Sequence, residues 1–353
     1  MSLLRLPPET LKQILDFVGS SFFHEDIGRL TVSKQWFDFA RPACFKCVTL
    51  VQETLRILIS SEDMSRLSPL TDSLETLDLN LRGYQACNST LYPQADAQEA
   101  NASETATPNE PLRDNPVKTW MKVLNNDLAQ LAIIGRQSRK LRILRIRAWS
   151  SPPPEILDNP EDYISLPTMR ALLSMENLSV LVLDLSVGLL ISSGEQEDGG
   201  HICPAIGALL RTLTTLHLRM RSICPDVLKP NDPNDDLRLS AVVVNLSLTT
   251  DLPGVTSAAH SKRCDPPGGG LLQLKADMQE QAEALAARMA SPKIMRILTH
   301  SLPQFETQSL DVLTGKIMIL DDDMAWDEDG KTVEDSEPES DLLDDDFSTF
   351  LDD

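Results

Sequence analysis

A leucine pattern recurs along this chain and limits the folds that the chain can adopt. In the pattern Leu-x-x-Leu-x-Leu, the last two leucines are separated by one residue, as buried residues along a half-buried strand are. Its five copies are Leu74-Leu77-Leu79, Leu141-Leu144-Ile146, Leu178-Leu181-Leu183, Leu213-Leu216-Leu218 and Val243-Leu246-Leu248. Stretches with helical spacing cover residues 53–67, 118–137, 168–175 and 205–211. Strands that alternate with helices predict an α/β domain with a parallel sheet.

The repeated strand–helix unit resembles a leucine-rich repeat, in which each unit buries its apolar side against the next. Successive copies start 67, 37, 35 and 30 residues apart, and the asparagine that usually follows the third leucine is missing. We therefore predict an irregular leucine-rich-repeat-like α/β solenoid over residues 51–320, with an ordinary α/β domain as the alternative. A helix over 271–290 and a hairpin over 309–320 predict that residues 271–320 cap its end.

Two segments have the composition of disordered chain. Residues 85–117 are rich in Ala, Asn, Pro, Thr, Gln and Glu, and they account for the longest gap between copies. Residues 321–353 hold 16 acidic residues and one lysine, so −15 of the chain's net charge of −21 lies there. Such segments bury too little apolar surface to offset their ordering entropy. We expect a disordered insertion and an acidic disordered tail that does not bind nucleic acid.

The first fifty residues predict three short helices, over 8–18, 25–32 and 33–40. Pro8 suits the first turn of a helix, and Gly19 is expected to end the first helix. Ser33 is expected to cap the third helix, and Arg41-Pro42 to end it, because a proline disfavours helix in the residue before it. Three short helices bury little surface, so their apolar faces are expected to need a partner.

The order of these residues resembles the F-box, the short helical module that docks onto the Skp-family adaptor of cullin-based ubiquitin ligases. The residues that carry the resemblance are Leu6-Pro7-x-Glu9, Leu11, Ile14-Leu15, Asp26-Ile27, Leu30, Val32-Ser33-Lys34-x-Trp36 and Ala40-Arg41-Pro42 with Phe45. It covers residues 1–50 and implies that the adaptor-binding residues are Leu6, Pro7, Glu9, Leu11, Ile14, Leu15, Leu30, Val32 and Trp36. An ordinary helical subdomain is the alternative.

This resemblance implies a substrate-recognition adaptor of an SCF-type ubiquitin ligase, which is not itself an enzyme. Its F-box binds the Skp-family adaptor and through it a cullin, while the repeat domain holds a protein target near the conjugating enzyme. The contribution to rate is proximity, so the chain supplies no catalytic residue. Two alternatives remain open: an F-box scaffold that acts without cullin or ubiquitylation, and an enzyme with an unrecognised site in the α/β domain.

The residues between the leucines are expected to line the concave face of the solenoid. Four of them give the middle of that face a positive character: Arg145, Arg147, His217 and Arg219. Arginine pairs with carboxylate or phosphate by two parallel hydrogen bonds, so an acidic or phosphorylated target is expected there. A normally solvated charged surface is the alternative. One hypothesis is that the acidic tail competes with the target for this face, and a tail that stays in the solvent is the alternative.

No catalytic or metal-binding motif is recognisable in the sequence. The five histidines are isolated and the six cysteines are scattered, and Cys44-x-x-Cys47 has no second pair of ligands at a compatible spacing. We therefore predict no metal and no cofactor. No apolar run reaches the length of a membrane span, and the N-terminus lacks a signal-peptide core. A cytoplasmic or nuclear protein without a membrane partner is expected.

Overall fold

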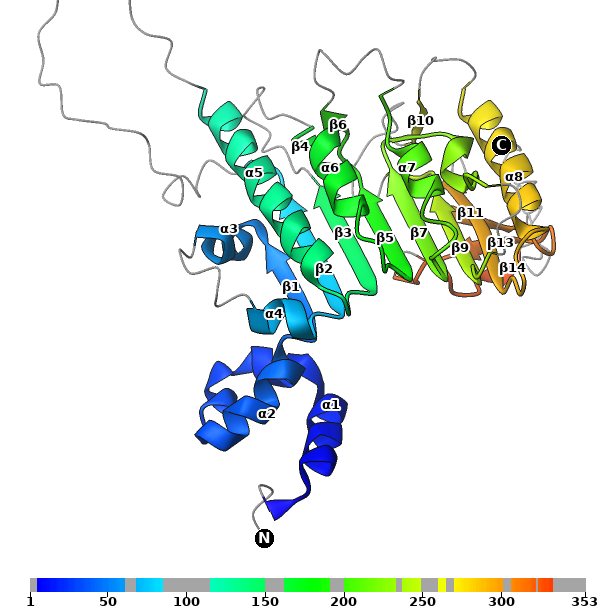
Figure 1. Cartoon of the computed structure of the whole chain (residues 1–353). Coiled ribbons are helices and arrows are strands. Elements are labelled where there is room, and N and C mark those ends of the chain that lie inside the picture. Colours follow the sequence, from blue (N-terminus) through cyan, green and yellow to red (C-terminus); the bar gives the residue numbers. More distant parts are fainter. Residues whose placement is uncertain are drawn as a thin grey trace, which may run out of the picture.

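The computed structural model describes residues 5–60, 68–84, 115–149, 162–190, 200–232, 237–248, 260–264, 270–300, 306–321 and 323–332. In this part of the chain, the strands of the main sheet follow the order β1-β2-β3-β5-β7-β9-β11-β12-β13-β14 (Figure 1). Eight α-helices accompany this large, mostly parallel sheet, so the described chain is a mixed α/β structure, as the leucine pattern predicts. None of these helices combines the length and apolar character that crossing a membrane requires.

The first seven strands of the sheet run parallel and follow one another in chain order. They are β1 (Cys47–Val51), β2 (Thr76–Arg82), β3 (Ile143–Trp149), β5 (Val180–Leu185), β7 (Thr215–Met220), β9 (Ala241–Asn245) and β11 (Ile294–His300). The register keeps the pattern leucines side by side, so that Leu144 pairs with Leu77 and with Leu181. All three are buried, and together with their neighbours they form one continuous core.

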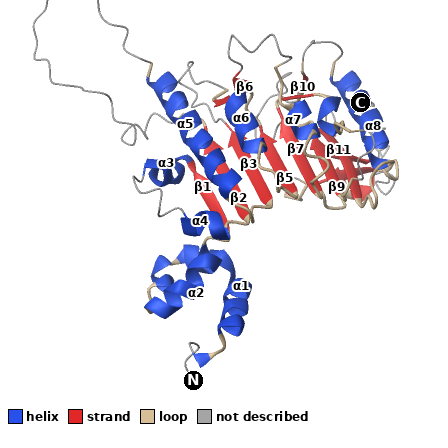
Figure 2. Cartoon of the chain, in the orientation of Figure 1, coloured by secondary structure: helices blue, strands red, loops and turns tan. Residues whose placement is uncertain are grey.

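Helices cover one face of the sheet, where the pattern leucines point (Figure 2). They are α3 (Gln52–Ser60), α4 (Ser68–Ser73), α5 (Pro116–Gln137), α6 (Leu166–Leu173), α7 (Cys203–Gly207) and α8 (Leu271–Ala286), with the 3₁₀ helix η6 (Pro225–Leu228). Two short parallel pairs lie outside the main sheet, β4 (Ile164–Ser165) with β6 (Leu189–Leu190) and β8 (Ser222–Ile223) with β10 (Lys262–Arg263).

We call the opposite side of the sheet the open face. Its residues alternate with the buried leucines, because successive side chains of a strand point to opposite sides. In β3, for example, Arg145 and Arg147 are exposed while Leu144 and Ile146 are buried. The open face carries the residues that the sequence analysis assigns to target binding.

The fifth leucine copy lies in a different register from the one that the sequence predicts. Val242 pairs with Leu216 and Val244 with Leu218, so these two valines are the counterparts of the core leucines. Val243 pairs with His217 and therefore lies on the open face, where it packs with Leu298. The prediction was wrong here because three consecutive valines leave the inward side of the strand undefined in sequence.

Antiparallel strands end the sheet. They are β12 (Thr307–Asp311), β13 (Ile317–Leu320) and β14 (Lys331–Thr332). The predicted hairpin is confirmed, and its turn places Gly315 at φ 74°, a conformation that favours glycine. Strand β11, which pairs with both β9 and β12, was not predicted.

The predicted disorder is wrong at the end of the insertion and at the start of the tail. Residues 323–332 have described structure, because Met324 and Trp326 pack against an apolar cluster on the open face. At the other segment, Asn115 caps α5, whose first residue is Pro116, so residues 115–117 belong to that helix. The remainder of the two predicted disordered segments lies outside the described residues, namely residues 85–114, 322 and 333–353.

The N-terminal helices form a separate small layer below the first strand (Figure 1). They are α1 (Pro8–Glu25), the 3₁₀ helix η2 (Ile27–Leu30) and α2 (Lys34–Cys44). Gly19 interrupts α1 at φ 81°, but a further helical stretch reaches Glu25, so the glycine breaks the helix without ending it. Helix α2 continues past Pro42 to Cys44, contrary to prediction, because Ala43 and Cys44 gain burial in the core of these helices.

Candidate functional site

The N-terminal helices share a small apolar core, which we call the module core. It consists of Leu11, Leu15, Phe23, Leu30, Ala40, Ala43 and Cys44, with Trp36 and Phe39 packed against it. Ser33 caps α2 as predicted, since its hydroxyl accepts a hydrogen bond from the Trp36 N–H at 3.1 Å. The indole Nε1 of Trp36 donates to the carbonyl of Arg29 at 2.7 Å, which ties α2 to η2.

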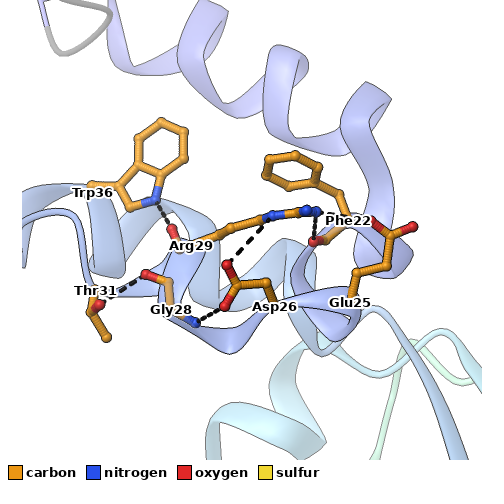
Figure 3. A network of polar contacts seen from close by, with 7 residues as sticks. All are labelled: Phe22, Glu25, Asp26, Gly28, Arg29, Thr31 and Trp36. Carbon is orange, nitrogen blue, oxygen red and sulfur yellow. Dashed lines mark hydrogen bonds and ion pairs between the residues drawn. The ribbon is translucent and has the colours of Figure 1, made fainter.

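Arg29 holds the corner between α1 and η2 (Figure 3). Its Nη1 donates to the Phe22 carbonyl at 2.6 Å and to the Glu25 carboxylate at 3.0 Å, and its guanidinium lies 4.2 Å from the centre of the Phe22 ring. Asp26 caps η2 by accepting from the Gly28 N–H at 2.8 Å. These contacts fix the backbone around Ile27, whose own side chain points out of the core and is 69% exposed.

The nine residues assigned to adaptor binding fall into two groups. Leu11, Leu15 and Leu30 are buried in the module core, so they hold the helices together. The others reach the surface at least in part: Leu6, Pro7, Glu9, Ile14, Val32 and Trp36. Phe17 and Ile27 add apolar surface that the assignment does not contain. Sequence periodicity predicted an apolar face but did not separate its core-facing side from its outer side.

Lys46 connects the N-terminal helices to the sheet. Its Nζ lies 3.7 Å from the Asp16 carboxylate of α1 and 3.4 Å from the Glu75 carboxylate, which precedes β2. The Lys46 carbonyl accepts hydrogen bonds from the N–H groups of Glu75 and Thr76. Helix α2 also contacts α4. The surface presented by these helices is therefore attached to the first strands of the sheet.

The four residues assigned to target binding lie together on the open face. Arg145 is two positions along the sheet from His217, with Val182 between them, and Arg147 is two positions from Arg219, with Asp184 between them. The shared face is as predicted, because the leucines next to these residues set the register. The sequence did not predict that two aspartates of the same face pair with these arginines.

Asp184 and Asp78 neutralise much of the positive charge of the open face. Arg219 makes two hydrogen bonds to Asp184, at 2.6 and 2.9 Å, and the Nε of Arg147 lies 3.9 Å from the same carboxylate. Arg145 pairs with Asp78 at 3.2 Å. The side chain of Arg219 is only 13% exposed, whereas that of Arg147 is 67% exposed. The part of the face that can receive a partner is therefore around Arg145 and Arg147.

Residues 323–332 lie over the other part of the open face. The guanidinium of Arg219 is 5.0 Å from the centre of the Trp326 ring. The buried Arg296 donates hydrogen bonds to the Glu328 carbonyl and to the Asp329 carboxylate. Burial lowers the pKa of His217, with Arg145 acting in the same direction and the nearby Asp327 in the opposite one. The start of the acidic tail thus occupies the side of the face that holds His217 and Arg219.

A search against models of known protein families found no match to this chain. A search of curated proteins found no match either.

Proposed function

We propose that this chain is a substrate-recognition adaptor of an SCF-type ubiquitin ligase, with an F-box over residues 1–50 and an irregular leucine-rich-repeat-like receptor domain behind it. One observation supports the proposal most. The module core is complete without Ile27 and Val32, yet these two apolar side chains at the η2 corner are 69% and 70% exposed. Apolar side chains held outward in a fixed backbone are typical of a protein–protein contact.

The parallel sheet supports the receptor part of the proposal. Seven parallel strands in chain order stack their strand–helix units, and the exposed arginines of β3 lie on the free part of the open face. An acidic or phosphorylated target is the partner that suits Arg145 and Arg147, because guanidinium binds carboxylate and phosphate with two parallel hydrogen bonds. The chain acts by holding the target close to the transfer reaction, in the cytoplasm or the nucleus.

The experiment that tests the proposal is co-purification of the Skp-family adaptor with variants of the full chain. The double variants Leu6→Ala with Pro7→Ala, and Ile27→Asp with Val32→Asp, are expected to lose the adaptor, because they remove or charge outward apolar groups and leave the module core intact. The matched control is Leu272→Asp, since Leu272 is an apolar residue of α8 that is 84% exposed and lies outside the module.

Circular dichroism and thermal melting of each variant establish that the fold is kept. Loss of the adaptor from both double variants, with full recovery by the control, supports the F-box assignment. Undiminished recovery by both double variants contradicts it. The same preparations, probed for a cullin, distinguish a ligase subunit from a scaffold.

A further inference from the structure

Three cysteines and a histidine from distant parts of the chain meet near one end of the helical layer. They are His201, Cys203, Cys224 and Cys264, and their ligand atoms all lie within 4.8 Å of one another. The Sγ atoms of Cys203 and Cys264 are 3.7 Å apart, and Cys224 Sγ is 3.7 Å from His201 Nδ1. All three cysteines are buried. We call this group the Cys₃His cluster.

The separations in the cluster match those of ligands around one tetrahedral zinc ion. With Zn–S near 2.3 Å and Zn–N near 2.0–2.1 Å, a tetrahedron places two sulfurs about 3.8 Å apart and a sulfur and a nitrogen about 3.6 Å apart. A disulfide requires sulfurs near 2.05 Å, which is far shorter than the 3.7 Å between Cys203 and Cys264. A simple contact between two thiols would not explain why a third sulfur and an imidazole nitrogen lie equally close.

We propose that the Cys₃His cluster binds one Zn²⁺ as a structural site. Thiolate and imidazole ligands favour zinc over the oxygen-preferring Mg²⁺ and Ca²⁺, and four protein ligands leave no open position for a reacting water. Three thiolates and one Zn²⁺ carry a net charge of −1. Arg263 belongs to β10, which pairs with β8 beside the cluster. Its side chain lines a cavity of about 390 Å³ together with His201, Cys224 and Cys264. This cavity gives the ion a path to the ligands.

The bound ion joins three segments of the chain. His201 and Cys203 lie at the start of α7, Cys224 precedes η6, and Cys264 follows β10. Strand β10 pairs with β8 over only two residue pairs, Lys262 with Ser222 and Arg263 with Ile223. A shared ion therefore fixes residues 260–264 against α7 and η6. Because the ligands must be brought together by folding, zinc binding and the stability of this end of the sheet are coupled.

Metal analysis of the full-length chain, purified without a polyhistidine tag, tests the proposal. Inductively coupled plasma mass spectrometry is expected to find about one zinc per chain. Cys224→Ser and Cys264→Ser are each expected to lose at least about nine-tenths of it, because each removes one of four ligands. The matched control is Cys47→Ser, which alters the lone Cys-x-x-Cys pair between the end of α2 and the start of β1 and should keep the full zinc content.

A second measurement remains decisive if the serine variants fail to fold. The wild-type chain, produced in zinc-depleted medium with Co²⁺, is expected to show the visible bands of tetrahedral cobalt and a thiolate charge-transfer band. A chain with no zinc and no cobalt bands overturns the proposal, as does a Cys203–Cys264 disulfide found by mass spectrometry. Zinc that is lost from Cys47→Ser but kept by Cys224→Ser also overturns it, and so does iron in place of zinc.

Discussion

The imidazole of His217 lies next to Asp327, with Nε2 4.0 Å from the carboxylate Oδ2. This pair joins the middle of the parallel sheet to the start of the acidic tail, 110 residues later in the chain. The Nε2 atom is buried and has no hydrogen-bond partner among the described residues. Trp326 extends the contact by covering Arg219. The side of the open face that the sequence analysis assigns to an acidic target is therefore already in contact with an acidic segment of the same chain.

We predict that residues 323–332 open locally and compete with an acidic target for the open face. Trp326→Ala combined with Asp327→Asn removes the ring over Arg219 and the charge beside His217. Hydrogen exchange is expected to speed up in the segment and in β13, which pairs with β14 at its end, while the parallel strands stay protected. Unchanged exchange in both regions contradicts local opening.

Once a target is identified, the same variant tests the competition. It is expected to bind an acidic target more tightly than wild type at low salt, because a tethered segment reaches an effective concentration of about a millimolar. The two affinities are expected to converge at high salt, where exposed charges are screened within about 10 Å or less. Lys331→Ala is a suitable control, because Lys331 is in the same segment but its exposed side chain pairs with Asp321. Equal affinities for variant and wild type at both salt concentrations refute the competition.

The second prediction concerns pH. Burial lowers the pKa of His217 below its ordinary value of 6.5, so the unfolded chain binds this proton more readily than the folded chain. The free energy of unfolding is therefore expected to fall as the pH drops through 6.5, and to level off below the pKa of the folded state. His217→Gln should flatten this dependence, measured by urea unfolding between about pH 5 and 7.5. His260, whose pKa burial also lowers, keeps part of the slope in that variant.

Asp327→Asn provides the opposite test of the same pair. The Asp327 carboxylate favours the protonated imidazole, so its removal is expected to lower the pKa of His217 further and to steepen the loss of stability at acidic pH. A parallel shift of the whole curve, without a change of slope, shows that the two groups are not coupled.

The sequence predicted the parallel strands well because their burial repeats locally. Leu77, Leu144 and Leu181 occupy the same place in the pattern, and the structure puts them in register. The valine-rich β9 shows the limit of this reasoning, because Val242 and Val243 are equally apolar and only the neighbouring strands determine which of them faces the core. Val243 is itself buried on the open face, where it packs with Leu298 and Leu320, so both sides of β9 are buried.

The site residues were harder to predict, because tertiary contacts bring them together. The spacing of Arg219 and Asp184 in sequence gives no sign of their two hydrogen bonds; only the parallel register makes them neighbours. The Cys₃His cluster is similar. His201 and Cys203 are separated by one residue, but Cys224 and Cys264 reach them through the pairing of β8 with β10. A search for the Cys-x-x-Cys spacing finds only Cys44-x-x-Cys47 in this chain, which is not part of the cluster.

The third prediction concerns the break in α1. Gly19 has φ 81° and ψ 171°, a region that is essentially restricted to glycine. No atom lies within 4 Å of the place that a Cβ would occupy, so Gly19→Ala tests backbone strain without a steric clash. We expect a loss of about 1–3 kcal/mol in the stability of the N-terminal helices. The control is Gly270→Ala, a position with equally free space and an ordinary φ. Equal effects of the two changes, measured by chemical unfolding, contradict the prediction.

The last prediction concerns Tyr163, whose hydroxyl links the ends of two neighbouring strands. Its ring is buried against Trp120, with ring centres 5.4 Å apart, and its hydroxyl lies 3.1 Å from the carbonyls of both Leu81 and Trp149. These carbonyls belong to β2 and β3, which the single hydroxyl proton joins by alternating or shared donation. Tyr163→Phe keeps the ring and removes the donor, so we expect a loss of about 1 kcal/mol in the free energy of unfolding. Tyr163→Leu also removes the aromatic packing and is expected to cost about 1 kcal/mol more. If Tyr163→Phe unfolds at the same urea concentration as wild type, the hydroxyl does not stabilise the strand ends, and the aromatic ring alone explains the burial of this residue.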